Sequence, residues 1–138
     1  MARDSNPQET GPAISTEDAE KKLAGKTILV IEDEAFVAIA ICDSFADAGA
    51  NVIGPIATLD EAVEHAGGEG IDGAVVDIDL AGLDVFPAAD ILKRRGIPFL
   101  FQTGHGTRAE LQADYPDVPV CKKPVPRGEL LKAMAAIL

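Results

Sequence analysis

The stretch Thr27-Ile28-Leu29-Val30-Ile31-Glu32-Asp33-Glu34 joins a short run of β-branched and aliphatic residues directly to three carboxylates. A continuous apolar run of this length is typical of a strand that is buried on both faces, as in a parallel sheet. Residues 34–48 then place apolar side chains three or four positions apart and stop at Gly49, a pattern that predicts a helix. A buried strand followed by a helix is the repeating unit of an α/β fold.

The same unit recurs along the rest of the chain. Further strands are predicted at 51–54, 73–78, 97–101 and 118–121, and further helices at 58–66, 85–95, 108–113 and 126–138. Right-handed crossovers leave few ways to arrange five such strands. We therefore expect an α/β fold with a doubly wound five-stranded parallel sheet, in the strand order 2-1-3-4-5.

Length and charge limit the classes of function. The 138 residues suit a single domain, which we place at 26–138. Residues 1–25 are expected to form a flexible tail that contains a short helix beginning near Ser15. The 12 basic and 23 acidic side chains give a net charge of −11, which argues against binding to nucleic acid or to an anionic membrane.

The expected location is the cytoplasm. No apolar run approaches the ~18 residues that a membrane-spanning helix needs, and the first residues lack the apolar segment of a signal peptide.

Polar side chains follow four of the predicted strands. In an open parallel sheet, ligands bind beyond the carboxyl ends of the strands, where the strand order reverses. The residues at these ends are Glu32, Asp33 and Glu34, then Asp77 and Asp79, then Thr103, and finally Lys123. Crowded carboxylates repel one another and call for a hard cation such as Mg²⁺. A lysine and a hydroxyl opposite the cation suit the oxygens of a phosphoryl group, and an aspartate can accept that group as an acyl phosphate.

Each feature also has an ordinary structural explanation when it is taken alone. Acidic residues at 32–34 suit the first turn of a helix, and Asp77-x-Asp79 suits a turn after a strand. A pair of lysines at 122–123 is commonly no more than a solvated surface pair. What favours a phosphoryl-transfer pocket is that all of them fall at strand ends in one consistent order.

Residues 26–138 resemble the response-regulator receiver domain of two-component signalling, which has a flavodoxin-like fold. The motifs that carry the resemblance are Ile28 to Glu34, Val75 to Leu80, Thr103-Gly104 and Lys123-Pro124. The resemblance implies that Asp77 is the phosphoacceptor. It also implies that Mg²⁺ is held by Glu32, Asp33, Asp77 and the backbone carbonyl of Asp79.

The resemblance assigns further roles to the ends of the last two strands. It implies that Thr103 is a switch hydroxyl, that Lys123 is the positive partner of the phosphoryl group, and that the Lys123-Pro124 peptide is cis. Receiver domains usually carry Tyr or Phe three residues before the lysine, as a switch that rotates on phosphorylation. Here that position is Val120, so readout by an aromatic rotation is not expected.

The segment from Pro98 to His105 is similar to the alphaproteobacterial "FAT GUY" subgroup of single-domain response regulators. Gln102 stands where that subgroup usually has Ala, and His105 stands where an aromatic residue is common. The resemblance implies a sensor histidine kinase as partner, of the HWE or a related class. It also implies a downstream protein or phosphotransfer partner.

The expected function is that of a phosphoacceptor signalling domain rather than an enzyme. A phosphoryl group would pass from a kinase phosphohistidine to Asp77, and water would later remove it. Two alternatives remain at this stage. One is a receiver-shaped interaction module that works without phosphorylation. The other is a Mg²⁺-dependent enzyme. A Toprim domain would leave Thr103 and Lys123-Pro124 unexplained, and a haloacid-dehalogenase phosphatase has its Asp-x-Asp on the first strand of a longer chain.

Overall fold

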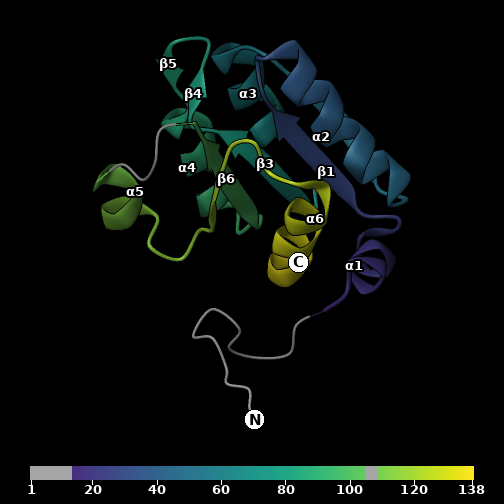
Figure 1. Ribbon diagram of the computed structural model, residues 1–138. Helices are drawn as coiled ribbons and strands as arrows, with labels where there is room; N and C mark the ends of the chain where they lie inside the picture. The colour runs from purple at the N-terminus through teal and green to yellow at the C-terminus, as the bar shows by residue number, and fades with distance from the viewer. Residues whose placement is uncertain (1–13, 105–108) are drawn as a thin grey trace.

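A five-stranded parallel sheet forms the centre of the molecule. The computed structural model describes residues 14–104 and 109–138. The sheet has the order β2-β1-β3-β6-β7, which confirms the order predicted from the sequence (Figure 1). Its strands are β1 (Thr27–Ile31), β2 (Asn51–Ile56), β3 (Gly73–Asp77), β6 (Phe99–Thr103) and β7 (Val120–Lys122).

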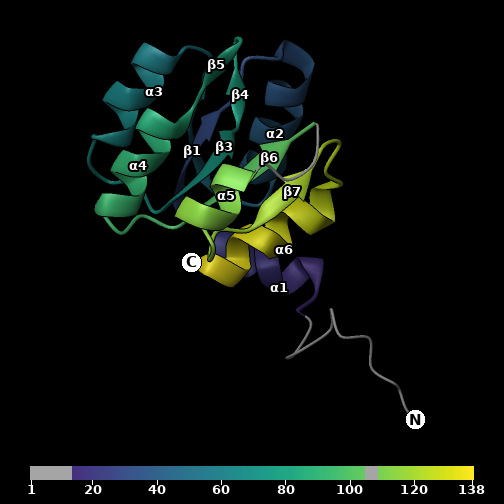
Figure 2. The same ribbon diagram turned by 90° about the vertical axis from the view of Figure 1, so that its left-hand side faces the viewer.

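Helices cover both faces of the sheet, as Figure 2 shows. One face packs against α2 (Ala35–Asp47) and α6 (Arg127–Ile137), and the other packs against α3 (Leu59–Ala66), α4 (Phe86–Arg94) and α5 (Ala109–Asp114). Each of these helices corresponds to a predicted one. Within 14–104 and 109–138, no helix has the length and apolar character required to span a membrane.

The central strands send alternate side chains into the two cores. Val30, Val75 and Leu100 are neighbours in register across β1, β3 and β6, and all three are fully buried. They belong to the core beneath α2 and α6. We call these three residues the apolar row, because the site lies two residues further along the same strands.

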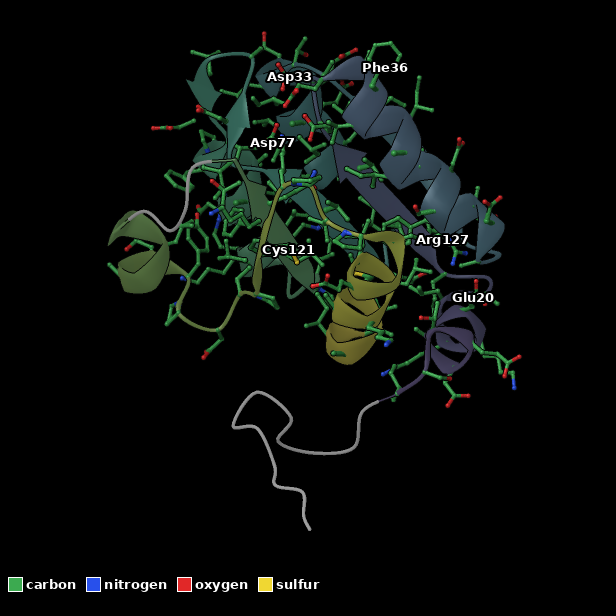
Figure 3. All side chains as sticks on the ribbon, in the orientation of Figure 1. Glu20, Asp33, Phe36, Asp77, Cys121 and Arg127 are labelled. Atoms are coloured by element: carbon green, nitrogen blue, oxygen red, sulfur yellow. The ribbon has the colours of Figure 1, made fainter. Side chains whose placement is uncertain are left out.

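A helix precedes the first strand and belongs to the core. In α1 (Thr16–Leu23), Leu23 is fully buried and packs in the same cluster as residues of α2 and α6. Arg127 of α6 donates a hydrogen bond to Glu20 at 2.7 Å, so a charged pair joins the two helices as well (Figure 3). Helix α1 ends before the predicted domain start at residue 26, yet it packs as part of the same unit.

The segment after β3 forms a small hairpin where the sequence predicted only a loop. Strands β4 (Asp79–Leu80) and β5 (Leu83–Asp84) are antiparallel and are joined by Ala81 and Gly82. Both turn residues have positive φ, 52° and 82°, as a type I′ turn requires. Strands of two residues are too short to show an alternating pattern, which is why the sequence did not predict them.

Candidate functional site

Three polar side chains lie two residues beyond the apolar row. Glu32, Asp77 and Gln102 are 1%, 2% and 1% exposed, as deeply buried as the apolar residues before them. Asp77 and Gln102 are register partners on β3 and β6, and Glu32 directly follows β1. Side chains two positions apart on a strand point to the same face. These three residues, which we call the polar row, therefore face α2 and α6.

Acidic side chains at this edge are close enough to share one cation. Glu32, Asp33 and Asp77 each offer a carboxylate oxygen, and these oxygens lie within 4.8 Å of one another. Figure 3 shows Asp33 and Asp77 at the same end of the sheet. Two of the three groups are buried and Asp33 is half-buried. An all-oxygen set that is open to water on one side fits Mg²⁺, which keeps several of its own water ligands.

A single lysine bridges the carboxylates. Lys123 Nζ lies 2.9 Å from Glu32 Oε1, 3.1 Å from Asp77 Oδ2 and 3.2 Å from Glu34 Oε1. Burial lowers the pKa of Lys123, but its hydrogen bonds to Glu32 and Asp77 and their charges outweigh that effect and raise the pKa overall. The ammonium is therefore firmly protonated. The Lys123-Pro124 peptide is cis, as predicted.

Asp77 is held in an environment that disfavours its charge. Burial, followed by the hydrogen bond and charge of neighbouring Glu32, raises the pKa of Asp77 to about 7, and Lys123 opposes this rise only in part. The Asp77 Oδ1 atom accepts a weak hydrogen bond from the backbone N–H of Asp79 at 3.2 Å. A cation bound beside Asp77 would favour its ionised form, because an opposite charge offsets the cost of burial.

Glu32 receives three donors. Its Oε1 accepts from Gln102 Nε2 at 3.0 Å as well as from Lys123, and its Oε2 accepts from the backbone N–H of Glu34 at 3.1 Å. Gln102 was not among the predicted site residues. The available signal was one amide directly after the apolar run Phe99-Leu100-Phe101, and the sequence alone did not show which group that amide contacts.

The other predicted residues surround this centre. Thr103 is 6% exposed at the end of β6, and its carbonyl accepts from the backbone N–H of Lys123 at 2.9 Å, which ties the ends of β6 and β7 together. Asp79 is exposed on the hairpin. Val120 is half-buried and pairs in register with Phe101. His105 lies outside the described residues.

A groove leads from the site along the surface. It has a volume of about 660 Å³, and α2 and α6 form its sides while Gln102 and Lys123 line the end nearest Asp77. Phe36 at the start of α2 lines the groove and is 89% exposed, and Ile39 one turn later is 53% exposed. Large apolar side chains this exposed are typical of surfaces that bind another protein.

Comparisons with solved structures point to one class of domain. The chain matches a response regulator receiver protein from Sinorhizobium medicae with 26% identity and a TM-score of 0.73, over 82% of this chain and 94% of that one. It matches SdrG from Sphingomonas melonis with 31% identity and a TM-score of 0.71, over 82% and 96%.

A third match bears on the acidic cluster. The receiver domain of the sensor histidine kinase PA1611 from Pseudomonas aeruginosa was solved with a magnesium ion in its active-site cleft. It is 25% identical, with a TM-score of 0.68 over 82% of this chain and 99% of that one. No protein-family model and no curated protein matches the chain.

Proposed function

We propose that this chain, which has the fold of the response-regulator receiver domains that it matches, carries a signal by accepting a phosphoryl group on Asp77 from a histidine kinase. The observation that carries the proposal is the surroundings of Asp77. Its carboxylate is buried, lies within 4.8 Å of the oxygens of Glu32 and Asp33, and is 3.1 Å from Lys123. In this proposal the chain is a signalling phosphoacceptor and does not turn over a separate substrate.

The proposed transfer needs few groups from the protein. A carboxylate oxygen of Asp77 attacks the phosphorus as the nitrogen–phosphorus bond of a phosphohistidine breaks, and the released imidazole nitrogen takes up a proton. A bound Mg²⁺, held by Glu32, Asp33, Asp77 and the carbonyl of Asp79, would neutralise charge on the phosphoryl oxygens. The receiver domain that was solved with magnesium in its cleft supports this choice of ion.

Lys123 and Thr103 would respond to the new group. The phosphoryl oxygens offer Lys123 a stronger acceptor than a shared carboxylate, so its ammonium would move toward them. Thr103 stands at the end of the neighbouring strand, and its hydroxyl would move toward the same group. Such contacts favour one arrangement of the segment that follows β6, which is how a local charge becomes a changed surface. Water later attacks the phosphorus and releases the Asp77 carboxylate.

The kinase would dock beside α2. A phosphohistidine must come within bonding distance of a buried carboxylate, so its domain has to cover the mouth of the site. Phe36 and Ile39 offer exposed apolar contacts next to that mouth. We propose a kinase of the HWE or a related class and membership of the "FAT GUY" subgroup. The signal would then pass to a downstream protein or drain from a shared kinase.

The first test uses a small phosphoryl donor. Wild type and Asp77→Asn are incubated with acetyl phosphate or phosphoramidate, with and without Mg²⁺, and intact mass is measured. We expect the wild type to gain one phosphoryl unit only with Mg²⁺, and the variant to gain none. A phosphorylated Asp77→Asn would place the acceptor elsewhere. A wild type that binds Mg²⁺ but is phosphorylated neither by small donors nor by any purified kinase would favour an interaction module that works without phosphorylation.

The second test separates docking from chemistry. Phe36→Asp should leave phosphorylation by phosphoramidate unchanged, because Phe36 is 89% exposed and is neither a hydrogen-bond partner of Asp77 nor a member of the acidic cluster. It should slow transfer from an autophosphorylated kinase that phosphorylates the wild type by about tenfold or more, as expected for an interface anchor. Equal rates with the kinase would move the docking surface away from α2.

A further inference from the structure

Gln102 is a buried amide that follows three buried apolar residues of β6, Phe99, Leu100 and Phe101. Leu100, two residues earlier on the same face of β6, is a fully buried member of the cluster beneath α2 and α6. Gln102 is 1% exposed, so it gives up water for its amide group. Burying an amide is unfavourable unless a partner replaces the lost hydrogen bonds. The described partner of this amide is Glu32, at 3.0 Å.

The chemistry of the two groups fixes the direction of the bond. An ionised carboxylate only accepts hydrogen bonds, so the amide must donate through Nε2. Gln102 is the register partner of Asp77 on one side, and Glu32 directly follows β1, the strand that pairs with β3 on the other side. The amide therefore reaches across the phosphoacceptor strand to hold a carboxylate on the far side of it.

The bond from Gln102 to Glu32 matters because Lys123, the other side chain that donates to Glu32, also contacts other acceptors. One ammonium now serves Glu32, Asp77 and Glu34. Once Asp77 carries a phosphoryl group, its oxygens compete for the same ammonium, and Glu32 loses its 2.9 Å partner. A neutral donor that stays in place keeps the buried Glu32 oriented whichever way Lys123 turns. Removing a partner that orients a metal ligand in this manner typically weakens metal binding about 10–100-fold.

We propose that Gln102 is a positioning residue that holds Glu32 in the geometry needed to bind Mg²⁺. The inference rests on the proposed function, because it assumes that Glu32 helps to hold the ion. It goes beyond that function by giving a role to a side chain that is neither the phosphoacceptor nor one of the proposed metal ligands.

The test compares two methionine substitutions on the same face of β6. Gln102→Met keeps the length of the side chain and removes both polar ends, and Leu100→Met is the matched control for a methionine in this core. Mg²⁺ is titrated into each protein, and the dissociation constant is followed by calorimetry. The rise in melting temperature at a fixed Mg²⁺ concentration gives a second readout that needs no phosphoryl transfer.

We expect Gln102→Met to bind Mg²⁺ about tenfold more weakly than wild type, the lower end of the range for such partners, and Leu100→Met to bind it unchanged. The rise in melting temperature should shrink only in Gln102→Met. Gln102→His, whose ring nitrogen can donate over a similar reach, should recover part of the affinity at pH 8.

Three results would count against the inference, and a different one would count against the function. Equal Mg²⁺ affinity of Gln102→Met and wild type overturns the positioning role. Equal weakening in both methionine variants assigns the effect to core packing and overturns it too. If Gln102→Met proves unfolded, Gln102→Leu takes its place, and equal Mg²⁺ affinity of a folded Gln102→Leu and wild type overturns the role. A wild type that binds no Mg²⁺ contradicts the proposed function itself.

Discussion

The apolar row and the polar row are two consecutive layers of the same sheet face. The apolar row consists of Val30, Val75 and Leu100, and the polar row of Glu32, Asp77 and Gln102. All six side chains are at most 2% exposed. Degree of burial therefore does not distinguish the core from the site. The difference lies in what replaces water around each row, which is packing in one and a lysine with a few N–H donors in the other.

Substitutions in the two rows should therefore reduce the stability of the fold in different ways. An apolar row loses stability in proportion to the contacts that are removed, and pH has little influence. A polar row depends on the balance of charge, so its stability changes with pH and with the cation present. Three substitutions make this difference measurable.

The largest effect is expected from Lys123→Met. Removing the ammonium leaves the buried carboxylates of Glu32 and Asp77 without a counter-charge, and breaking such a pair costs about 3 kcal/mol or more. The loss should grow as pH rises, because more of the carboxylates are then ionised. Urea unfolding between pH 5 and 8 without Mg²⁺ measures it. A loss that is the same at every pH would show that Lys123 acts through packing, and the contrast between the rows would fail.

An intermediate effect is expected from Leu100→Ala in the apolar row. Truncating a fully buried leucine leaves a cavity and costs about 2–5 kcal/mol. The cost should be the same at pH 5 and pH 8 and with or without Mg²⁺, since Leu100 is an uncharged side chain in the apolar core beneath α2 and α6. The same urea titrations provide the measurement. A strong dependence on Mg²⁺ would mean that the two rows are coupled.

The smallest effect, and one of opposite sign, is expected from Asp77→Asn. The pKa of Asp77 is raised from 3.8 to about 7, so folding favours its protonated form. That contribution is present below pH 4 and is lost as pH rises through 7, so ionised Asp77 destabilises the protein at pH 8. An uncharged asparagine should therefore raise stability by about 1 kcal/mol at pH 8 and by less near pH 4.

Added Mg²⁺ should make the wild type more stable than Asp77→Asn. Added Mg²⁺ stabilises the wild type by binding its folded state, and the variant lacks one of the proposed ligands. Melting curves at pH 8, with and without Mg²⁺, record both effects. A variant that is less stable than wild type in the absence of Mg²⁺ would show that the pair between Asp77 and Lys123 outweighs the cost of burial.

The sequence predicted the sheet because buried parallel strands appear as continuous apolar runs, and the run ending at Ile31 is the clearest of them. It predicted Asp77, Glu32 and Lys123 as site residues because each follows such a run, and the structure brings these three together. Their roles in phosphoryl transfer stay predictions. The bond from Gln102 to Glu32 could not be foreseen, because it depends on the register of three strands that lie far apart in the chain.

Helix α1 packs against a helix that the ribosome makes much later than α1 itself. Its partner α6 lies far along the chain, since Glu20 of α1 and Arg127 of α6 are 107 residues apart in sequence. At the usual rate of about 5–20 residues per second, Leu23 has to wait several seconds for the surface that buries it. The central strands can pair during that time. The docking of α1 onto α6, with the ion pair between Glu20 and Arg127, is therefore a step of assembly that comes after the synthesis of the five strands of the central sheet, which lie between the two helices in sequence.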